Sequence, residues 1–257
     1  MKVAILAGGL GTRLSEETTV KPKPMVEIGG KPILWHIMKI YAAHGFNEFV
    51  VALGYKGEAI KEYFLKYHYH SRSLTIQLKT GGVYAHNQNG EDWTVHLLDT
   101  GMQTQTGGRI KQIAEFIGDE PFMLTYGDGV GNINIPDLLR FHQSHGGLAT
   151  LTAVHPPARF GQMVFNDNDE VIEFVEKPQL GEGWINGGFF VLQPEIARYI
   201  DGDQSIFERE PLQRLASDGQ LKAYCHSNFW YCMDTLRDVQ LLNKLWEEGD
   251  APWKIWK

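Results

Sequence analysis

Two short segments near the start of the chain combine glycine with basic side chains, a combination that suits phosphate binding. Residues 8–14 read GGLGTRL, and residues 21–25 read KPKPM. A glycine-rich loop after a strand can turn several backbone N–H groups toward one anion, while Arg13 and Lys23 add positive charge. The prolines on both sides of Lys23 restrict the backbone and so fix its ammonium group. The two segments therefore predict a triphosphate site; the alternative is an ordinary strand-to-helix turn beside a solvated basic loop.

Neither of two common nucleotide-binding motifs explains these segments. The GxGxxG fingerprint of dinucleotide-binding proteins would need glycine in place of Leu14. A P-loop would need glycine in place of Met25 and Ser or Thr in place of Pro32. The sequence also lacks the HExxH and Cys/His zinc spacings and a Ser–His–Asp pattern. A dinucleotide-dependent oxidoreductase, a zinc enzyme and a covalent enzyme intermediate are therefore not indicated.

Two aspartates in later parts of the chain predict a metal site. Asp128 follows the apolar run at residues 122–125, and Asp234 follows residues 229–233, so each is expected at the carboxyl end of a strand. In open α/β sheets, ligands bind at that edge. Two carboxylates that converge there suit a hard cation such as Mg²⁺. Either aspartate alone could instead cap a helix.

These residues need a fold that brings distant segments together. From residue 3 to about 145, short apolar runs alternate with amphipathic stretches, which predicts an α/β fold with a Rossmann-like, doubly wound, mixed and mostly parallel sheet. After residue 147 the strands have few helices between them, which predicts a small antiparallel β extension. We expect one domain over residues 1–257, with parts at 1–147, 148–235 and 236–257. A further sheet strand is expected at 74–78, followed by a long polar connection at 81–92 that we interpret as a subunit contact.

Composition excludes several classes of function. The chain has 24 Lys and Arg against 31 Asp and Glu, a net charge of −7, which argues against binding a nucleic acid polymer or an anionic membrane. No apolar run reaches the length of a membrane helix, and residues 1–14 do not fit a signal peptide. Two cysteines without a CxxC pair favour a reducing, cytoplasmic compartment. Residues 1–31 nevertheless carry five basic and three acidic side chains, so a small positive site is expected within an acidic protein.

The motifs resemble the signature of sugar-1-phosphate nucleotidylyltransferases. The resemblance covers residues 1 to about 240 in order and includes YGD at 126–128, EKP at 176–178, NGGF at 186–189 and FWYCMDT at 229–235. It implies nucleotide binding by Leu6, Ala7, Gly8, Gly9, Gly11, Thr12, Arg13, Lys23, Thr104, Arg109 and Gly127. It implies sugar-phosphate binding by Glu176, Lys177, Asn186, Gly187 and Trp230, Mg²⁺ binding by Asp128 and Asp234, and catalysis by Arg13, Lys23, Asp128 and Asp234. The part at 1–147 would then bind the nucleotide, and the part at 148–235 would bind the sugar phosphate.

Within this family, residues 104–109 and 229–235 most resemble members that use CTP and glucose 1-phosphate. The resemblance implies transfer of a cytidylyl group to α-D-glucose 1-phosphate by in-line attack, in a homo-oligomer such as a hexamer. Arg109 would reach the triphosphate and Trp230 would form an apolar wall, while Thr106 could simply cap a helix. Two alternatives stay open: a thymidylyl- or uridylyltransferase acting on another sugar 1-phosphate, and a non-catalytic nucleotide-sensing homologue.

Overall fold

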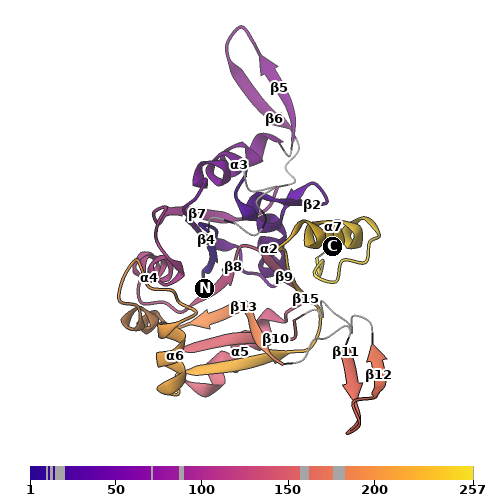
Figure 1. Ribbon diagram of the computed structural model, residues 1–257. Coiled ribbons are helices and arrows are strands. Elements are labelled where there is room, and N and C mark those ends of the chain that lie inside the picture. The colour runs from indigo at the N-terminus through magenta and orange to yellow at the C-terminus, as the bar shows by residue number, and fades with distance from the viewer. Residues whose placement is uncertain are drawn as a thin grey trace.

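The computed structural model describes residues 1–9, 11, 14, 21–70, 72–86, 90–156, 162–175 and 183–256. At its centre lies a seven-stranded sheet of order β14-β10-β13-β8-β1-β4-β7 (Figure 1). In chain order these strands are β1 (Val3–Leu6), β4 (Glu48–Leu53), β7 (Thr94–Asp99), β8 (Phe122–Tyr126), β10 (Ala149–Val154), β13 (Ile185–Leu192) and β14 (Leu221–His226). Only β13 runs antiparallel to its two neighbours in this sheet. The other four pairs are parallel, so the predicted mixed, mostly parallel sheet is confirmed.

The helices cover both faces of the sheet. They are α2 (Ile33–Ala42), α3 (Gly57–His70), α4 (Thr106–Ile117), α5 (Ile135–His145), α6 (Glu210–Ser217) and α7 (Leu236–Glu247), with the short 3₁₀ helices η2 (Lys23–Met25) and η3 (Pro194–Tyr199). Val3 and Ile5 of β1 pack into one apolar core, and Ala4 and Leu6 pack into the other. Burial on both faces explains why the parallel strands are continuous apolar runs. None of the helices in the described part of the chain is long and apolar enough to cross a lipid bilayer.

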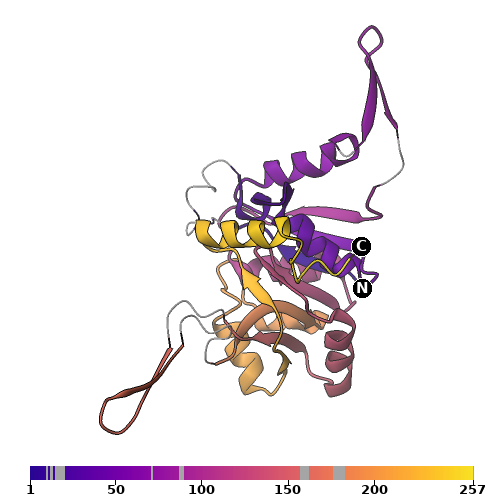
Figure 2. The ribbon, with the colours of Figure 1, turned by 90° about the vertical axis from the view of Figure 1, so that its right-hand side faces the viewer.

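Two β hairpins project from opposite ends of the molecule (Figure 2). One pairs β5 (Ser73–Gln77) with β6 (Gly82–His86), so the expectation that 74–78 joins the main sheet and 81–92 is a plain connection is wrong. Its apolar side chains face solvent, with Ile76 56% and Leu78 92% exposed. The other hairpin pairs β11 (Gln162–Phe165) with β12 (Val171–Val175) and forms the predicted antiparallel extension. After residue 147, the strands β10, β13 and β14 complete the main sheet.

A small two-stranded sheet brings the second half of the chain to the carboxyl end of β8. The strands β9 (Gly129–Gly131) and β15 (Trp230–Cys232) pair antiparallel, with Cys232 opposite Gly129. The backbone N–H of Met233 then donates to the carbonyl oxygen of Asp128 at 2.8 Å. The pairing brings Asp128, directly before β9, close to Asp234, two residues after β15.

The carboxyl-terminal segment is anchored to α2 through a buried histidine. The Nε2–H of His36 donates to the carbonyl oxygen of Ile28 at 2.8 Å. Its Nδ1 therefore accepts the indole N–H of Trp253, at 3.3 Å, and the ring of Trp246 packs edge-on against the imidazole. Burial lowers the pKa of His36 to about 4. A proton on Nδ1 would face the Trp253 donor, so the anchor requires the neutral imidazole.

Acid should weaken this anchor before it affects most carboxylates. The folded pKa of His36 is about 4 against 6.5 for the free side chain, so the unfolded chain takes up the proton first. The contribution to stability is complete above pH 6.5 and falls as the pH drops toward 4, by about 2 kcal/mol at pH 5. Urea unfolding of the wild type and His36→Gln at pH 8 and pH 5 should show a smaller loss in the variant. The other buried histidines are common to both proteins, and an equal loss in both would contradict the assignment.

Candidate active site

A cavity of about 410 Å³ lies at the carboxyl ends of β1 and β8. Its lining includes the predicted nucleotide-binding residues that the structure describes, namely Leu6, Ala7, Gly8, Gly9, Gly11, Lys23, Thr104, Arg109 and Gly127, together with Asp128 and Asp234. The predicted residues Thr12, Arg13, Glu176 and Lys177 lie outside the described residues. Tyr126 also lines the cavity and was not predicted, although its place between a buried strand and Gly127 could have indicated it.

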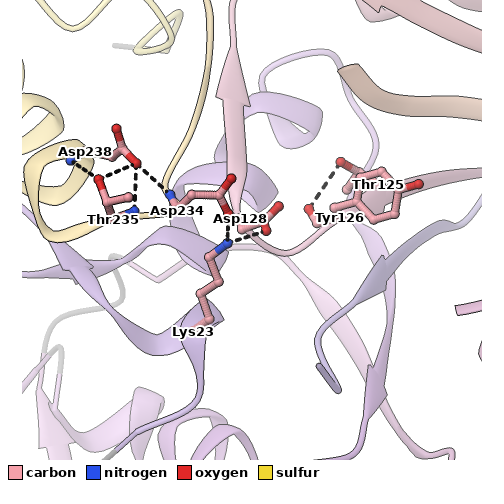
Figure 3. A network of polar contacts seen from close by, with 7 residues as sticks. All are labelled: Lys23, Thr125, Tyr126, Asp128, Asp234, Thr235 and Asp238. Carbon is pink, nitrogen blue, oxygen red and sulfur yellow. Dashed lines mark hydrogen bonds and ion pairs between the residues drawn. The ribbon is translucent and has the colours of Figure 1, made fainter. Parts of the chain in front are cut away.

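Three charged side chains meet at the wall of the cavity. The ammonium group of Lys23 lies 2.7 Å from Oδ2 of Asp128 and 2.6 Å from Oδ1 of Asp234 (Figure 3). The Lys23 side chain is only 12% exposed. Burial opposes its charge, but the Asp128 carboxylate and the hydrogen bonds to both aspartates outweigh burial and raise the pKa of Lys23. The lysine is therefore charged and holds the two carboxylates together.

The backbone around Asp234 is held by the first turn of α7. The side chain of Thr235 caps this helix, and Asp238 completes a capping box. Oδ2 of Asp238 accepts the backbone N–H groups of Asp234 at 3.0 Å and Thr235 at 2.7 Å (Figure 3). Its Oδ1 accepts the hydroxyl of Tyr231 at 3.0 Å. The buried carboxylate of Asp238, three residues after the N-cap residue Thr235, therefore positions Asp234. The TxxD spacing at 235–238 is a sequence signal that could have found Asp238.

Arg109 lines the cavity but is also bonded within the chain. The residue is only 4% exposed, and its guanidinium donates to three of the chain's own acceptors. It donates to the carbonyl oxygen of Leu53 at 2.7 Å, to that of Gly8 at 3.1 Å, and to the hydroxyl of Thr100. A Cβ atom on Gly8 would lie 2.4 Å from the Arg109 guanidinium, so only glycine permits this contact. Arg109 forms the floor of the site and fixes the glycine loop from below.

This anchoring sets the direction of the next amide. The carbonyl oxygen of Gly8 accepts from Arg109 and from the backbone N–H of Tyr55 at 3.2 Å. Carbonyl and N–H groups of one trans peptide point in opposite directions. The N–H of Gly9 is therefore turned away from Arg109 at a position that lines the cavity.

Two of the predicted sugar-binding residues, Asn186 and Gly187, lie at a bulge of β13. The register of β13 against β10 shifts between Ala153 and Leu151, at the stretch 186–190. Trp230 was expected as an apolar wall, but its indole N–H donates to the carbonyl oxygen of Gly187 at 2.7 Å and so holds this bulge. Asn186 donates through Nδ2 to the hydroxyl of Tyr126 at 3.1 Å, and this links the bulge to the cavity lining.

Thr106 does not cap the helix that it begins. The N-cap position of α4 is Gln105, which makes no capping side-chain bond. The hydroxyl of Thr106 instead donates to Oε2 of Glu208 at 2.6 Å and accepts the backbone N–H of Phe207 at 2.9 Å. The start of α4 is therefore tied to the segment before α6.

The donors around Lys23 suit a hard divalent cation. Two carboxylate oxygens already converge on one positive charge from different strands. Cys232 also lies nearby, with the ligand atoms of Asp128, Cys232 and Asp234 within 4.8 Å of one another. Burial and the Asp128 carboxylate raise the pKa of the Cys232 thiol, so it remains protonated at neutral pH. The two aspartates fit the expected metal, because a hard divalent cation prefers carboxylate oxygens to the sulfur of a thiol.

The fold and this arrangement agree with the comparisons. The family model described as "Nucleotidyl transferase" matches residues 2–247, so the chain belongs to this family and is a nucleotidyltransferase. Enzymes of this family generally use a divalent metal.

The chain is similar to proteins of this family that are named for different nucleotides. The chain is 53% identical to the glucose-1-phosphate cytidylyltransferase of Salmonella typhimurium, over the full length of both. It is 33% identical to the mannose-1-phosphate guanylyltransferase catalytic subunit beta of Dictyostelium discoideum, over 90% of this chain and 60% of the relative. The crystal structure of HddC from Yersinia pseudotuberculosis matches with a TM-score of 0.70 at 25% identity, over 95% of this chain and 99% of that one.

Removal of the Lys23 charge should strengthen metal binding in the absence of nucleotide. The ammonium neutralises carboxylates that a divalent ion would share, so Lys23→Met should bind Mn²⁺ at least about tenfold more tightly. Titration followed by electron paramagnetic resonance of free Mn²⁺ measures this directly. Lys21→Met is the matched control, because Lys21 pairs with Glu27 rather than with the aspartates. Equal Mn²⁺ affinity in the wild type and Lys23→Met would contradict the competition.

Proposed function

We propose that the protein transfers the cytidylyl group of CTP to α-D-glucose 1-phosphate, giving CDP-glucose and pyrophosphate. The reaction class is supported by one observation: Lys23 forms ion pairs with Asp128 and Asp234 beside a cavity lined by the glycine loop. The choice of base and sugar is supported by full-length identity of 53% to the cytidylyltransferase of Salmonella typhimurium. Residues 1–147 would bind the nucleotide and residues 148–235 the sugar phosphate, in one domain.

The base would lie against the rim at residues 102–106, which lines the cavity. This rim is held by two backbone hydrogen bonds, from Gln105 to the carbonyl of Asp203 and from Gly107 to the carbonyl of Ser205, both at 2.8 Å. A rim fixed in this way can distinguish bases by hydrogen bonding, and Thr104 carries a hydroxyl there. We assign Thr104 to the cytosine.

The triphosphate would lie over the glycine loop. The N–H of Gly9 and the ammonium of Lys23 donate to phosphate oxygens, and Arg13 adds a second cation from the glycine loop. An Mg²⁺ ion held by Asp128 and Asp234 would offset the negative charge of the triphosphate. Lys23 then exchanges its carboxylate partners for phosphate oxygens. The chain supplies position and charge, which suffice for phosphoryl-type transfer.

In the reaction, an oxygen of glucose 1-phosphate attacks the α-phosphorus of CTP. The new P–O bond forms as the bond to the β-phosphate oxygen breaks, and pyrophosphate leaves in line. Lys177 anchors the attacking phosphate, and Glu176 accepts hydrogen bonds from sugar hydroxyls. Asn186 donates to the hexose through the amide proton that Tyr126 does not use.

The assembly and its surroundings follow from the same proposal. The protein is a cytoplasmic homo-oligomer, such as a hexamer, without a nucleic acid or membrane partner. Exposed apolar side chains on the β5–β6 hairpin, Ile76 and Leu78 among them, support a subunit contact at residues 81–92 and the strand before them.

A matrix of nucleoside triphosphates against sugar 1-phosphates tests the proposed substrates. Pyrophosphate release should be fastest with CTP and glucose 1-phosphate.

Asp128→Asn keeps the size of the side chain but removes its charge, so it should lower turnover at least about 100-fold, with an unchanged circular dichroism spectrum. A faster rate with another pair would overturn the substrate assignment, and wild-type turnover in Asp128→Asn would overturn the role of the carboxylate.

A further inference from the structure

Glu208 reaches two sides of the cavity without lining it. This residue lies in the segment just before α6. Its Oε1 accepts the hydroxyl of Tyr126 and its Oε2 accepts the hydroxyl of Thr106, each at 2.6 Å. Tyr126 comes from the carboxyl end of β8 and Thr106 from the start of α4, and both line the cavity. One carboxylate therefore connects the rim assigned to the base with the strand that leads to Asp128.

The direction of every hydrogen bond in this network is determined. Oδ1 of Asn186 accepts the backbone N–H of Gly188 at 2.9 Å, so the amide nitrogen is the end that faces Tyr126. That nitrogen donates to the Tyr126 oxygen at 3.1 Å. The phenol has a single proton, and an ionised carboxylate can only accept, so Tyr126 donates to Glu208. The order is Asn186 to Tyr126 to Glu208, and one amide proton of Asn186 remains for a ligand.

The tyrosine ring has little freedom to adopt another position. Gly188 has φ +79°, and a Cβ atom there would lie 2.4 Å from Cδ2 of Tyr126. The ring therefore packs directly on the bulge of β13. With the ring fixed by packing and the hydroxyl fixed by Glu208, the orientation of the Asn186 amide is fixed as well.

We propose that Glu208 is a positioning residue for the sugar 1-phosphate, acting through Tyr126 on the amide of Asn186. The ligand class is a hexose 1-phosphate, and its hydroxyl accepts the free Asn186 proton. This inference rests on the proposed function, which assigns Asn186 to the hexose. The hydroxyls of Tyr126 and Thr106 both donate to the Glu208 carboxylate. An amide in its place would offer an N–H donor to one of these hydroxyls, so the Tyr126 hydroxyl would no longer be held in one direction.

Steady-state kinetics of Glu208→Gln test the inference. The KM for the sugar 1-phosphate should rise at least about tenfold and by more than the KM for the nucleotide, while kcat changes less than about threefold. Tyr126→Phe removes the middle of the same relay and should give a similar rise. In the double variant, the KM for the sugar 1-phosphate should not exceed the higher of the two single-variant values, because both substitutions break the same chain of hydrogen bonds. Glu210→Gln, with the same charge change two residues away, is the matched control and should behave as the wild type.

Several results would overturn the inference. An unchanged KM for the sugar 1-phosphate, an equal rise for both substrates, or effects that multiply in the double variant would each exclude a path through Tyr126 to the sugar. If Glu208→Gln does not fold, Tyr126→Phe alone tests the inference, because it should also raise the KM for the sugar 1-phosphate; an unchanged KM would then exclude the path. All variants are compared on the substrate pair that the wild type turns over fastest. An incorrect base or sugar assignment would therefore appear in the wild-type rates, and the inference is judged on the ratios between variants.

Discussion

Three segments that are far apart in the chain meet at the ammonium group of Lys23. Asp128 follows β8, Asp234 follows β15, and Lys23 itself opens η2. Two carboxylates this close would repel each other in a partly buried site, and each would lose hydration. The ion pairs with the lysine offset these costs and so permit the β9–β15 pairing that brings the aspartates together. The same charge arrangement is what a divalent ion and a triphosphate require, so the structural contact and the proposed chemistry share one set of atoms.

Around this centre, hydrogen bonds within the chain determine where the groups that line the cavity lie. Arg109 fixes the Gly8 carbonyl, Asp238 holds the backbone of Asp234, and Trp230 holds the bulge at Gly187. Glu208 holds the hydroxyl of Tyr126. Each forms its bonds within the chain alone, so the cavity has its shape before a substrate binds. A site whose supports are already in place loses little conformational entropy on binding, which favours positioning as the source of catalysis.

The sequence indicated the parts of the fold that depend on local pattern. Burial on both faces makes β1 and β8 continuous apolar runs, and a strand end followed by glycine and aspartate identified Asp128. The hairpin β5–β6 misled the same reasoning, because Leu74, Ile76 and Leu78 alternate as in a sheet strand although Ile76 and Leu78 are exposed. The periodicity shows which positions of a segment are apolar, but it does not show whether other parts of the structure bury them.

The contacts that assemble the site depend on long-range pairing, which no local pattern encodes. Three-residue strands such as β9 and β15 have no detectable periodicity, so their partnership could not be foreseen. A cation near the start of a helix is compatible with both a ligand and a buried carbonyl, so the inward direction of Arg109 could not be derived. Glu208 belongs to no motif and is recognised only when Thr106 and Tyr126 are seen to share it.

The most direct test of this account is a crystal structure of the protein with Mn²⁺ and a non-hydrolysable CTP analogue, with the ion located by its anomalous scattering. The account predicts an anomalous peak bound by both Asp128 and Asp234, with the ammonium of Lys23 moved onto a phosphate oxygen. A peak away from either carboxylate, or a Lys23 that still bridges both, would contradict it.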